Sequence, residues 1–147
     1  MMAQRAGTSV RDLVTHTFAT VEAKDLEALL RVFADDAIVI DPHFPTPRMR
    51  GKAAIRDGFR GAMGGTRSFG YTIVHYFESE DGQRAAVEMA THHVLRYGMT
   101  RAFPQVFIFD VADGRVTRLQ AYEPYGPPGI MGAFLLLARL AHRFART

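Results

Sequence analysis

Apolar residues recur at helical spacing in the first part of the chain and would lie on one face of a helix. Thr8 or Ser9 precedes the first such stretch and Asp25 precedes the second, and all three residue types cap helix N-termini well. Pro42 to Pro47 form a loop that neither a helix nor the interior of a sheet tolerates. The pattern predicts, in order, a helix over 9–23, a helix from Leu26 to the segment 34–36, a short strand over 37–41 and a helix over 52–63.

The pattern changes after Gly64-Gly65, where β-branched and aromatic residues become frequent. Short turns carrying Gly82, Gly98 and Gly114 separate these stretches, so consecutive strands should pair as antiparallel hairpins. The predicted strands run over 68–78, 84–97, 101–110 and 115–122. Helices followed by a curled, mostly antiparallel sheet give an α+β fold in which the helices cover one sheet face.

The composition narrows the possible chemistry. A chain of 147 residues without cysteine is long enough for one domain and excludes thiolate sites and disulfides. We expect no metal site, because His75, His92 and His93 lack ligand spacing.

The net charge of +3 comes from dispersed arginines, which argues against nucleic-acid binding. No signal-peptide core and no apolar run long enough to span a membrane is present, so we expect a cytoplasmic protein.

The C-terminal part, residues 125–147, combines a loop with a predicted amphipathic helix over 130–146. We expect this helix to pack on its own domain or on a dimer partner, with Pro127-Pro128 stiffening the connection. The alternative is a basic amphipathic helix on an anionic membrane surface. Of these two arrangements, we expect packing on the domain or on a partner, and we do not expect membrane binding.

Four motifs are characteristic of one superfamily. They are the run from Asp25 to Ala37, Asp41-Pro42, the segment from Pro47 to Arg56 with its Gly51-Lys52, and Asp113 to Val116. Over residues 8–124 the sequence resembles the nuclear transport factor 2-like superfamily, specifically its ketosteroid isomerase and SnoaL-like branch. The resemblance implies a cone-shaped curled antiparallel sheet wrapped round three helices, with an apolar pocket and a homodimeric assembly.

The resemblance also implies site residues. Asp41 matches the carboxylate base of ketosteroid isomerases, which in that family works beside a tyrosine and a protonated aspartate that hold the oxyanion. Thr17, Phe59 and Gln105 stand where that family has its hydrogen-bonding groups, so two of three donors are weak or apolar here. Losing one such donor costs roughly 100- to 1,000-fold in rate, which disfavours true steroid isomerisation.

Other candidates come from strand alternation. His92 and His93 are adjacent in one strand and face opposite sides of the sheet; the family alignment favours His92 inward, whereas the set containing His93 is more apolar. Asp41 is open to a second interpretation as a residue that only starts a turn. Further predicted pocket residues are His43, Phe107 and Tyr122.

The function that these residues favour is binding of a small hydrophobic molecule bearing a carbonyl or hydroxyl group. As an enzyme, the protein would be an isomerase, cyclase or dehydratase that needs no cofactor, with Asp41 as base and His92 as a proton carrier. The alternative is a non-catalytic ligand-binding or dimerisation module, which the changes at Thr17 and Phe59 favour.

Overall fold

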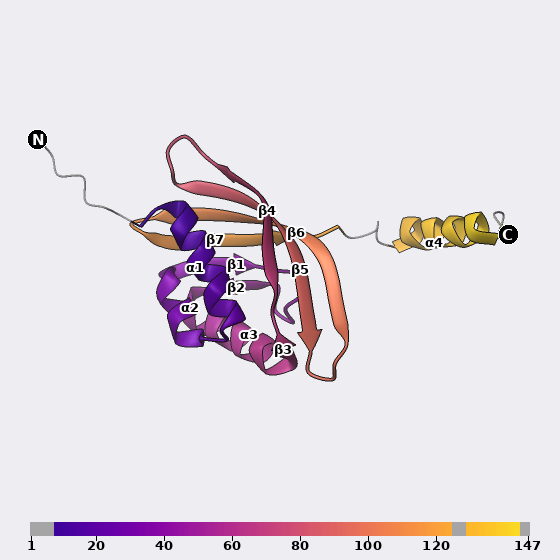
Figure 1. Cartoon of the computed structure of the whole chain (residues 1–147), viewed down its shortest axis with the longest axis horizontal. Helices are drawn as coiled ribbons and strands as arrows, with labels where there is room; N and C mark the ends of the chain where they lie inside the picture. The colour runs from indigo at the N-terminus through magenta and orange to yellow at the C-terminus, as the bar shows by residue number, and fades with distance from the viewer. Residues whose placement is uncertain (1–7, 125–128, 145–147) are drawn as a thin grey trace, which may run out of the picture.

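The computed structural model describes residues 8–124 and 129–144. Within them, three helices gather on one face of a curled sheet and a fourth follows the last strand (Figure 1). The elements are α1 (Val10–Glu22), α2 (Leu26–Val32), β1 (Phe33–Ile40), β2 (Arg48–Arg50), α3 (Gly51–Gly65), β3 (Thr66–Ser68), β4 (Tyr71–Glu78), β5 (Arg84–Leu95), β6 (Thr100–Ala112), β7 (Arg115–Tyr122) and α4 (Gly129–Phe144).

The sheet confirms the predicted α+β cone. Its strands run in the order β2-β1-β7-β6-β5-β3, and β4 also pairs with β5. The predicted hairpins β4–β5, β5–β6 and β6–β7 are antiparallel. β1 lies parallel to β7, so the sheet is mixed, and the short β2 forms inside the segment after the proline loop. The sequence pattern predicts neither of these two features.

The predicted helix caps are present. The Ser9 side chain accepts a hydrogen bond from the backbone N–H of Asp12, and the Asp25 side chain accepts one from Ala28. The second helix is shorter than predicted, because Phe33 is fully buried and pairs with Val116 of β7. β1 therefore begins four residues earlier than the pattern indicated.

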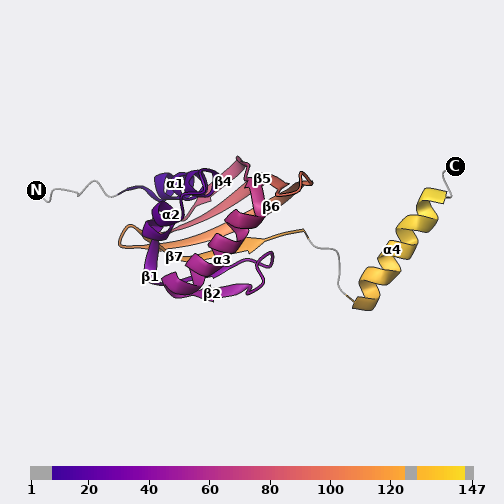
Figure 2. The same ribbon diagram turned by 90° about the horizontal axis from the view of Figure 1, so that it is seen from below.

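The helices and the concave face of the sheet enclose one core. Val14 of α1, Leu29 of α2 and Ile55 of α3 are fully buried, as are Phe33 and Phe109 on the strands. Figure 2 shows α3 lying over one face of the curled sheet, with α1 and α2 further along the same side. The helices cover the concave face of the sheet, and the enclosed cavity opens to solvent where the exposed residues Pro45, Gly61 and Arg101 line it.

α4 agrees with the predicted terminal helix and lies apart from the cone (Figures 1 and 2). Its packing on the domain or on a partner stays a prediction. Pro127-Pro128 and the predicted last helical turn beyond Phe144 lie outside the described residues. Among the helices that the structure describes, none has both the length and the apolar character needed to cross a bilayer.

Candidate functional site

The inside of the cone contains a cavity of about 730 Å³ between α1, α3 and the concave face of the sheet. Most of its wall is apolar, and a few polar side chains interrupt it. Six of the residues proposed from the sequence lie on this wall: Thr17, Asp41, His43, Phe59, Gln105 and Phe107.

The histidine that reaches the cavity is His93, and the preference for His92 is corrected. His93 lines the cavity between the rings of Tyr71 and Phe103, whereas His92 is exposed on the outer face of β5. Thr91 and Gln105, which share the face of His93, are buried. The more apolar set of alternating residues is thus the inner one, as burial of apolar surface requires.

Tyr122 is also placed differently from the prediction. It pairs with Val106 on the outer face of β6 and β7, and half of its surface is exposed. Its neighbour Ala121 takes the inward position and lines the cavity. Tyr122 therefore does not contact a ligand in the cone.

Asp41 both forms a turn and faces the cavity. One carboxylate oxygen, Oδ1, accepts the backbone N–H of His43 at 2.9 Å, which is the local turn expected of an aspartate before a proline. The side chain is nevertheless only 15% exposed. Burial raises the pKa of the Asp41 carboxyl above its usual value, against the opposing effect of the His43 backbone and ring. A raised pKa makes this carboxylate a stronger base near neutral pH.

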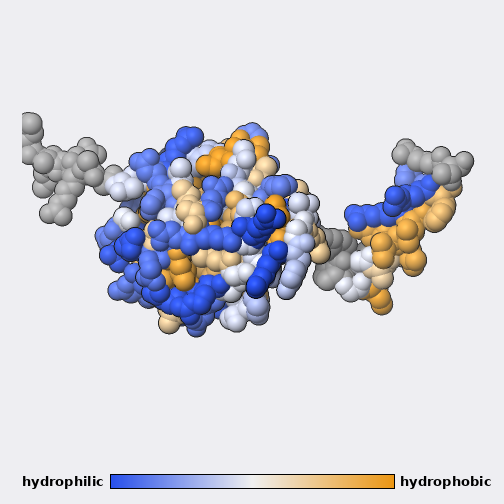
Figure 3. Space-filling view, turned by 60° about the horizontal axis from the view of Figure 1, so that its bottom comes forward, coloured by the Kyte–Doolittle hydropathy of each residue, from blue (hydrophilic) through white to orange (hydrophobic). Residues whose placement is uncertain are grey.

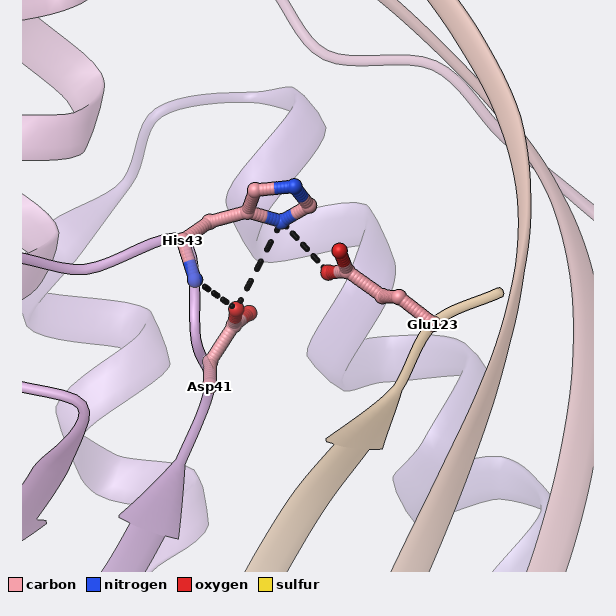
Figure 4. A group of neighbouring side chains, drawn as sticks. All are labelled: Asp41, His43 and Glu123. Atoms are coloured by element: carbon pink, nitrogen blue, oxygen red, sulfur yellow. Dashed lines mark hydrogen bonds and ion pairs between the residues drawn. The ribbon is translucent and has the colours of Figure 1, made fainter. Parts of the chain in front are cut away.

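His43 joins Asp41 to a second carboxylate, Glu123, which follows the end of β7 (Figure 4). The His43 Nδ1 atom is paired with Glu123 Oε1 and lies 3.6 Å from Asp41 Oδ1. The Glu123 side chain is only 2% exposed, although it carries a full charge when ionised. A carboxylate in such a place needs strong partners, since burying an unpaired charge is costly.

Gln105 is a second partner of Glu123. Its Nε2 donates to Glu123 Oε1 at 2.6 Å, and its Oε1 accepts the hydroxyl of Thr91 at 2.8 Å. The amide is fixed in one orientation, with an N–H directed at the carboxylate. A continuous polar chain therefore runs from Thr91 inside the sheet to Asp41 at the opening of the cavity.

The other two positions that carry hydrogen-bonding groups in the ketosteroid isomerases provide no donor. The Thr17 hydroxyl donates to the carbonyl of Leu13 in its own helix at 2.7 Å, so its proton is occupied. Phe59 is buried and its ring contacts Phe44. At these two places the helical wall of the cavity therefore offers a ligand no hydrogen-bond donor.

Tyr71, which the sequence did not single out, brings a phenol to the cavity wall. Burial and the negative charges of Asp41, Glu22 and Glu123 raise the pKa of Tyr71 well above its usual value. The phenol is therefore protonated at every physiological pH and is a hydrogen-bond donor. Tyr71 thus brings to the cavity wall a hydrogen-bond donor, which Thr17 and Phe59 do not provide.

His93 is held in its neutral form. Burial lowers the pKa of the His93 imidazole to about 4, and the nearby His43 adds to this effect. Its Nδ1 accepts the backbone N–H of Gly70 at 3.4 Å. At neutral pH this ring contributes its shape and a neutral polar group to the cavity, and no charge.

Asp41, His43 and Glu123 are also the residue types that ligate metals. Their potential ligand atoms all lie within 4.8 Å of one another, a grouping that their sequence spacing does not reveal. However, the ring of His43 and the amide of Gln105 both point at the same oxygen of Glu123. These hydrogen bonds account for the arrangement of the three side chains.

The chain was compared with models of known protein families and with known proteins. The model of the SnoaL-like domain matches residues 14–119, which is more than half of the chain. A search of curated proteins finds no significant match.

Solved structures with the same fold include proteins that bind or convert steroids. A Δ5-3-ketosteroid isomerase from Mycobacterium sp. has 25% identity and a TM-score of 0.71, with 80% of this chain and 93% of that chain covered. A Mycobacterium tuberculosis protein in complex with estradiol-17β-hemisuccinate has 23% identity and a TM-score of 0.70, with 79% and 93% covered. A proposed polyketide cyclase from Xanthomonas campestris pv. campestris has 24% identity and a TM-score of 0.68, with 79% and 89% covered. By the family match and this shared fold, the chain belongs to the SnoaL-like domain family.

Proposed function

We propose that the protein binds a small, largely apolar molecule bearing a carbonyl or hydroxyl group and catalyses a proton transfer on it. The observation that carries the proposal is Asp41, a buried carboxylate of raised pKa on the wall of an apolar cavity. The chemistry is an isomerisation, cyclisation or dehydration that needs no cofactor. The names of the structural relatives support the ligand class, because one is a steroid isomerase and another holds an estradiol derivative.

In this mechanism Asp41 takes a proton from a carbon beside the carbonyl, and the electron pair of that C–H bond moves toward the carbonyl oxygen. Tyr71, with its protonated phenol on the same wall, is the donor we assign to the developing oxyanion. In an isomerisation Asp41 then delivers a proton to another carbon, and the partly exposed carboxyl exchanges that proton with solvent while it holds it. Glu123 holds the His43 ring beside Asp41, and His43 in turn keeps the Asp41 carboxylate in position.

The second candidate function is a binding module without catalysis. It is favoured by Thr17, whose hydroxyl proton is occupied within α1, and by the apolar Phe59. These two functions differ in one measurable property, since only the enzyme exchanges a carbon-bound proton of its ligand with solvent.

The test is therefore solvent exchange. Steroid enones, terpenoid ketones and polyketide-like aromatic ketones are first screened for thermal stabilisation of the protein. Each stabilising compound is then incubated with the protein in D2O, and deuterium uptake is followed by mass spectrometry. We expect uptake with the natural protein, with or without EDTA, and its loss in Asp41→Asn with thermal stabilisation by the ligand retained.

Asp57→Asn is the matched control. Asp57 also lines the cavity but is 76% exposed and pairs with Arg60 on its own helix. This variant should exchange deuterium like the natural protein. Equal exchange in Asp41→Asn would show that Asp41 is not the base, and bound ligands that never exchange would favour the binding module.

A further inference from the structure

The terminal helix has an apolar face and a basic face, and carries no acidic residue. Ile130, Phe134 and Leu137 lie at helical spacing and are 87%, 68% and 65% exposed. Arg139 and Arg143 are four residues apart on the opposite side. Figure 3 shows α4 with hydrophobic residues along one side and hydrophilic ones along the other.

The charge of the chain is concentrated in this tail. All 15 acidic residues lie at or before Glu123, whereas Arg139, Arg143 and Arg146 follow it. Residues 1–123 therefore have equal numbers of acidic and basic side chains, and the net charge of +3 belongs to the last part of the chain. A neutral cone has no general electrostatic attraction for a basic helix, whereas an anionic surface does.

A second basic and apolar feature lies beside the opening of the cavity. The turn between β5 and β6 exposes Tyr97 and Met99, which are 94% and 63% accessible, between Arg96 and Arg101. Gly98, with φ of +85°, allows this tight turn. Aromatic and aliphatic side chains flanked by arginines are typical of surfaces that contact the interface of a bilayer.

Both features belong to the same end of the cone. Met99, Arg101 and Glu123 line one hollow together with His43, which also lines the main cavity. In Figures 1 and 2 the tip of the β5–β6 hairpin and the end of β7 lie on the same side of the molecule. Five Cα–Cα steps separate Pro124 from Gly129, so α4 begins within about 19 Å of this opening.

We propose that α4 and the Arg96–Arg101 turn dock the protein on a bilayer containing anionic lipid, with the opening of the cavity toward the lipid. The apolar face of α4 enters the boundary of the acyl chains, and its arginines contact the headgroups. The cavity then receives an apolar ligand from the membrane, where such molecules concentrate. The docking itself does not depend on the proposed proton transfer.

The experiment is vesicle co-sedimentation of the full chain. The vesicles contain phosphatidylcholine alone or mixed with phosphatidylglycerol. We expect binding only to the anionic vesicles, weakened by NaCl. Arg139→Gln/Arg143→Gln should weaken it by about five-fold per arginine, or roughly 25-fold. Phe134→Ser/Leu137→Ser should weaken it by about tenfold or more per side chain.

The matched control is Arg84→Gln/Arg115→Gln, which removes the same charge from the strand starts at the far end of the cone. These arginines are exposed and form only surface ion pairs, so the fold should tolerate the change. This variant should bind anionic vesicles like the natural protein.

Three outcomes overturn the proposal: no vesicle binding by the natural protein, equal weakening in the control variant, or a change of oligomeric mass in Phe134→Ser/Leu137→Ser without any change in vesicle binding. The last would make α4 a contact between copies, which is one of the two arrangements that we expect from the sequence. Deuterium exchange on a dissolved ligand, measured without vesicles, should be the same in the α4 variants. Failure of the docking is thereby distinguished from failure of the proposed function.

Discussion

The buried carboxylate of Glu123 affects the pKa of Asp41, the proposed base, and the His43 ring lies between the two carboxylates. Its negative charge contributes to the raised pKa of Asp41, and its Oε1 holds both His43 and Gln105. Glu123→Gln removes this charge while keeping the size and an acceptor. We expect the pKa of Asp41 to fall, so the acidic limb of the pH–rate profile for deuterium exchange moves to lower pH. A limb that does not move would show that the Glu123 charge is screened from Asp41.

Asp41 itself should limit stability at neutral pH. Because its pKa is raised in the folded state, the folded protein binds the proton more tightly than the unfolded chain does. Stability from this group is present at low pH and is lost as the pH rises through the folded pKa. Asp41→Asn, which retains an acceptor for the turn, should therefore have a Tm at neutral pH equal to or above that of the natural protein. A clear fall in Tm would instead assign Asp41 a structural role.

His93 gives the opposite pH dependence. Its folded pKa is about 4, below the usual 6.5, so the unfolded chain binds a proton that the folded protein excludes. The contribution of His93 is complete above about 6.5 and is lost as the pH falls toward about 4. His93→Phe should flatten this part of the stability curve measured by urea unfolding from pH 7 to pH 4. His92→Phe, on the exposed face of the same strand, is the control and should keep the curve.

For single residues, the sequence predicted the residue types of the site better than the orientation of their side chains. Asp41 could be placed because Asp-Pro follows a strand in a recognisable motif. The preference for His92 over His93 is wrong because a shift of one residue turns a strand over, and here the apolar pattern marks the inner face better than the family alignment does. Glu123 gives no periodic signal beyond the last strand, and Tyr71 lies in a strand with no motif.

The elements themselves follow closely from local rules. The caps at Ser9 and Asp25, and the three hairpins with glycine in their turns, were predictable because the chemistry that forms them is local. The parallel pairing of β1 with β7 was not, since it joins segments about eighty residues apart in the chain. Burial of Phe33 in that pairing also explains why β1 starts earlier than expected.

Gly70 immediately precedes β4 and packs tightly against β5. A Cβ atom at Gly70 would lie 2.7 Å from the backbone oxygen of His92, and backbone atoms there cannot move without separating the strands. Gly70→Ala should therefore destabilise the protein by about 1–3 kcal/mol and displace His93, whose Nδ1 accepts from Gly70.

Gly64→Ala in α3 is the matched control for this substitution. A Cβ atom at Gly64 meets nothing within 4 Å, and alanine favours a helix over glycine. Urea unfolding should show a stability equal to or above that of the natural protein. If Gly70→Ala unfolded at the same urea concentration as Gly64→Ala, the close approach of β4 and β5 would not be rigid.

For the whole molecule, the outer face of the sheet is the surface that we expect to pair two copies. Val106 and Tyr122 lie side by side there, 37% and 50% exposed, next to Pro104 and Ala90 on the neighbouring register positions. Burying an apolar strip of a sheet face against the identical strip of a second copy is favourable, and a twofold axis brings the same strip of both copies together. This places Tyr122 at the expected homodimer contact instead of in the cavity.

Val106→Glu should abolish that homodimer, because it would bring two like charges together in an apolar contact. Light scattering should give a mass of twice 16.4 kDa for the natural protein and 16.4 kDa for the variant. Glu88→Gln, at the position on β5 that pairs with Val106, should leave the dimer intact, since it removes a charge from the same face. Because the cavity opens away from this face, ligand stabilisation should survive in Val106→Glu. A natural protein of 16.4 kDa would contradict the dimer, whereas a variant that also loses the ligand would show that the second copy supports the cavity.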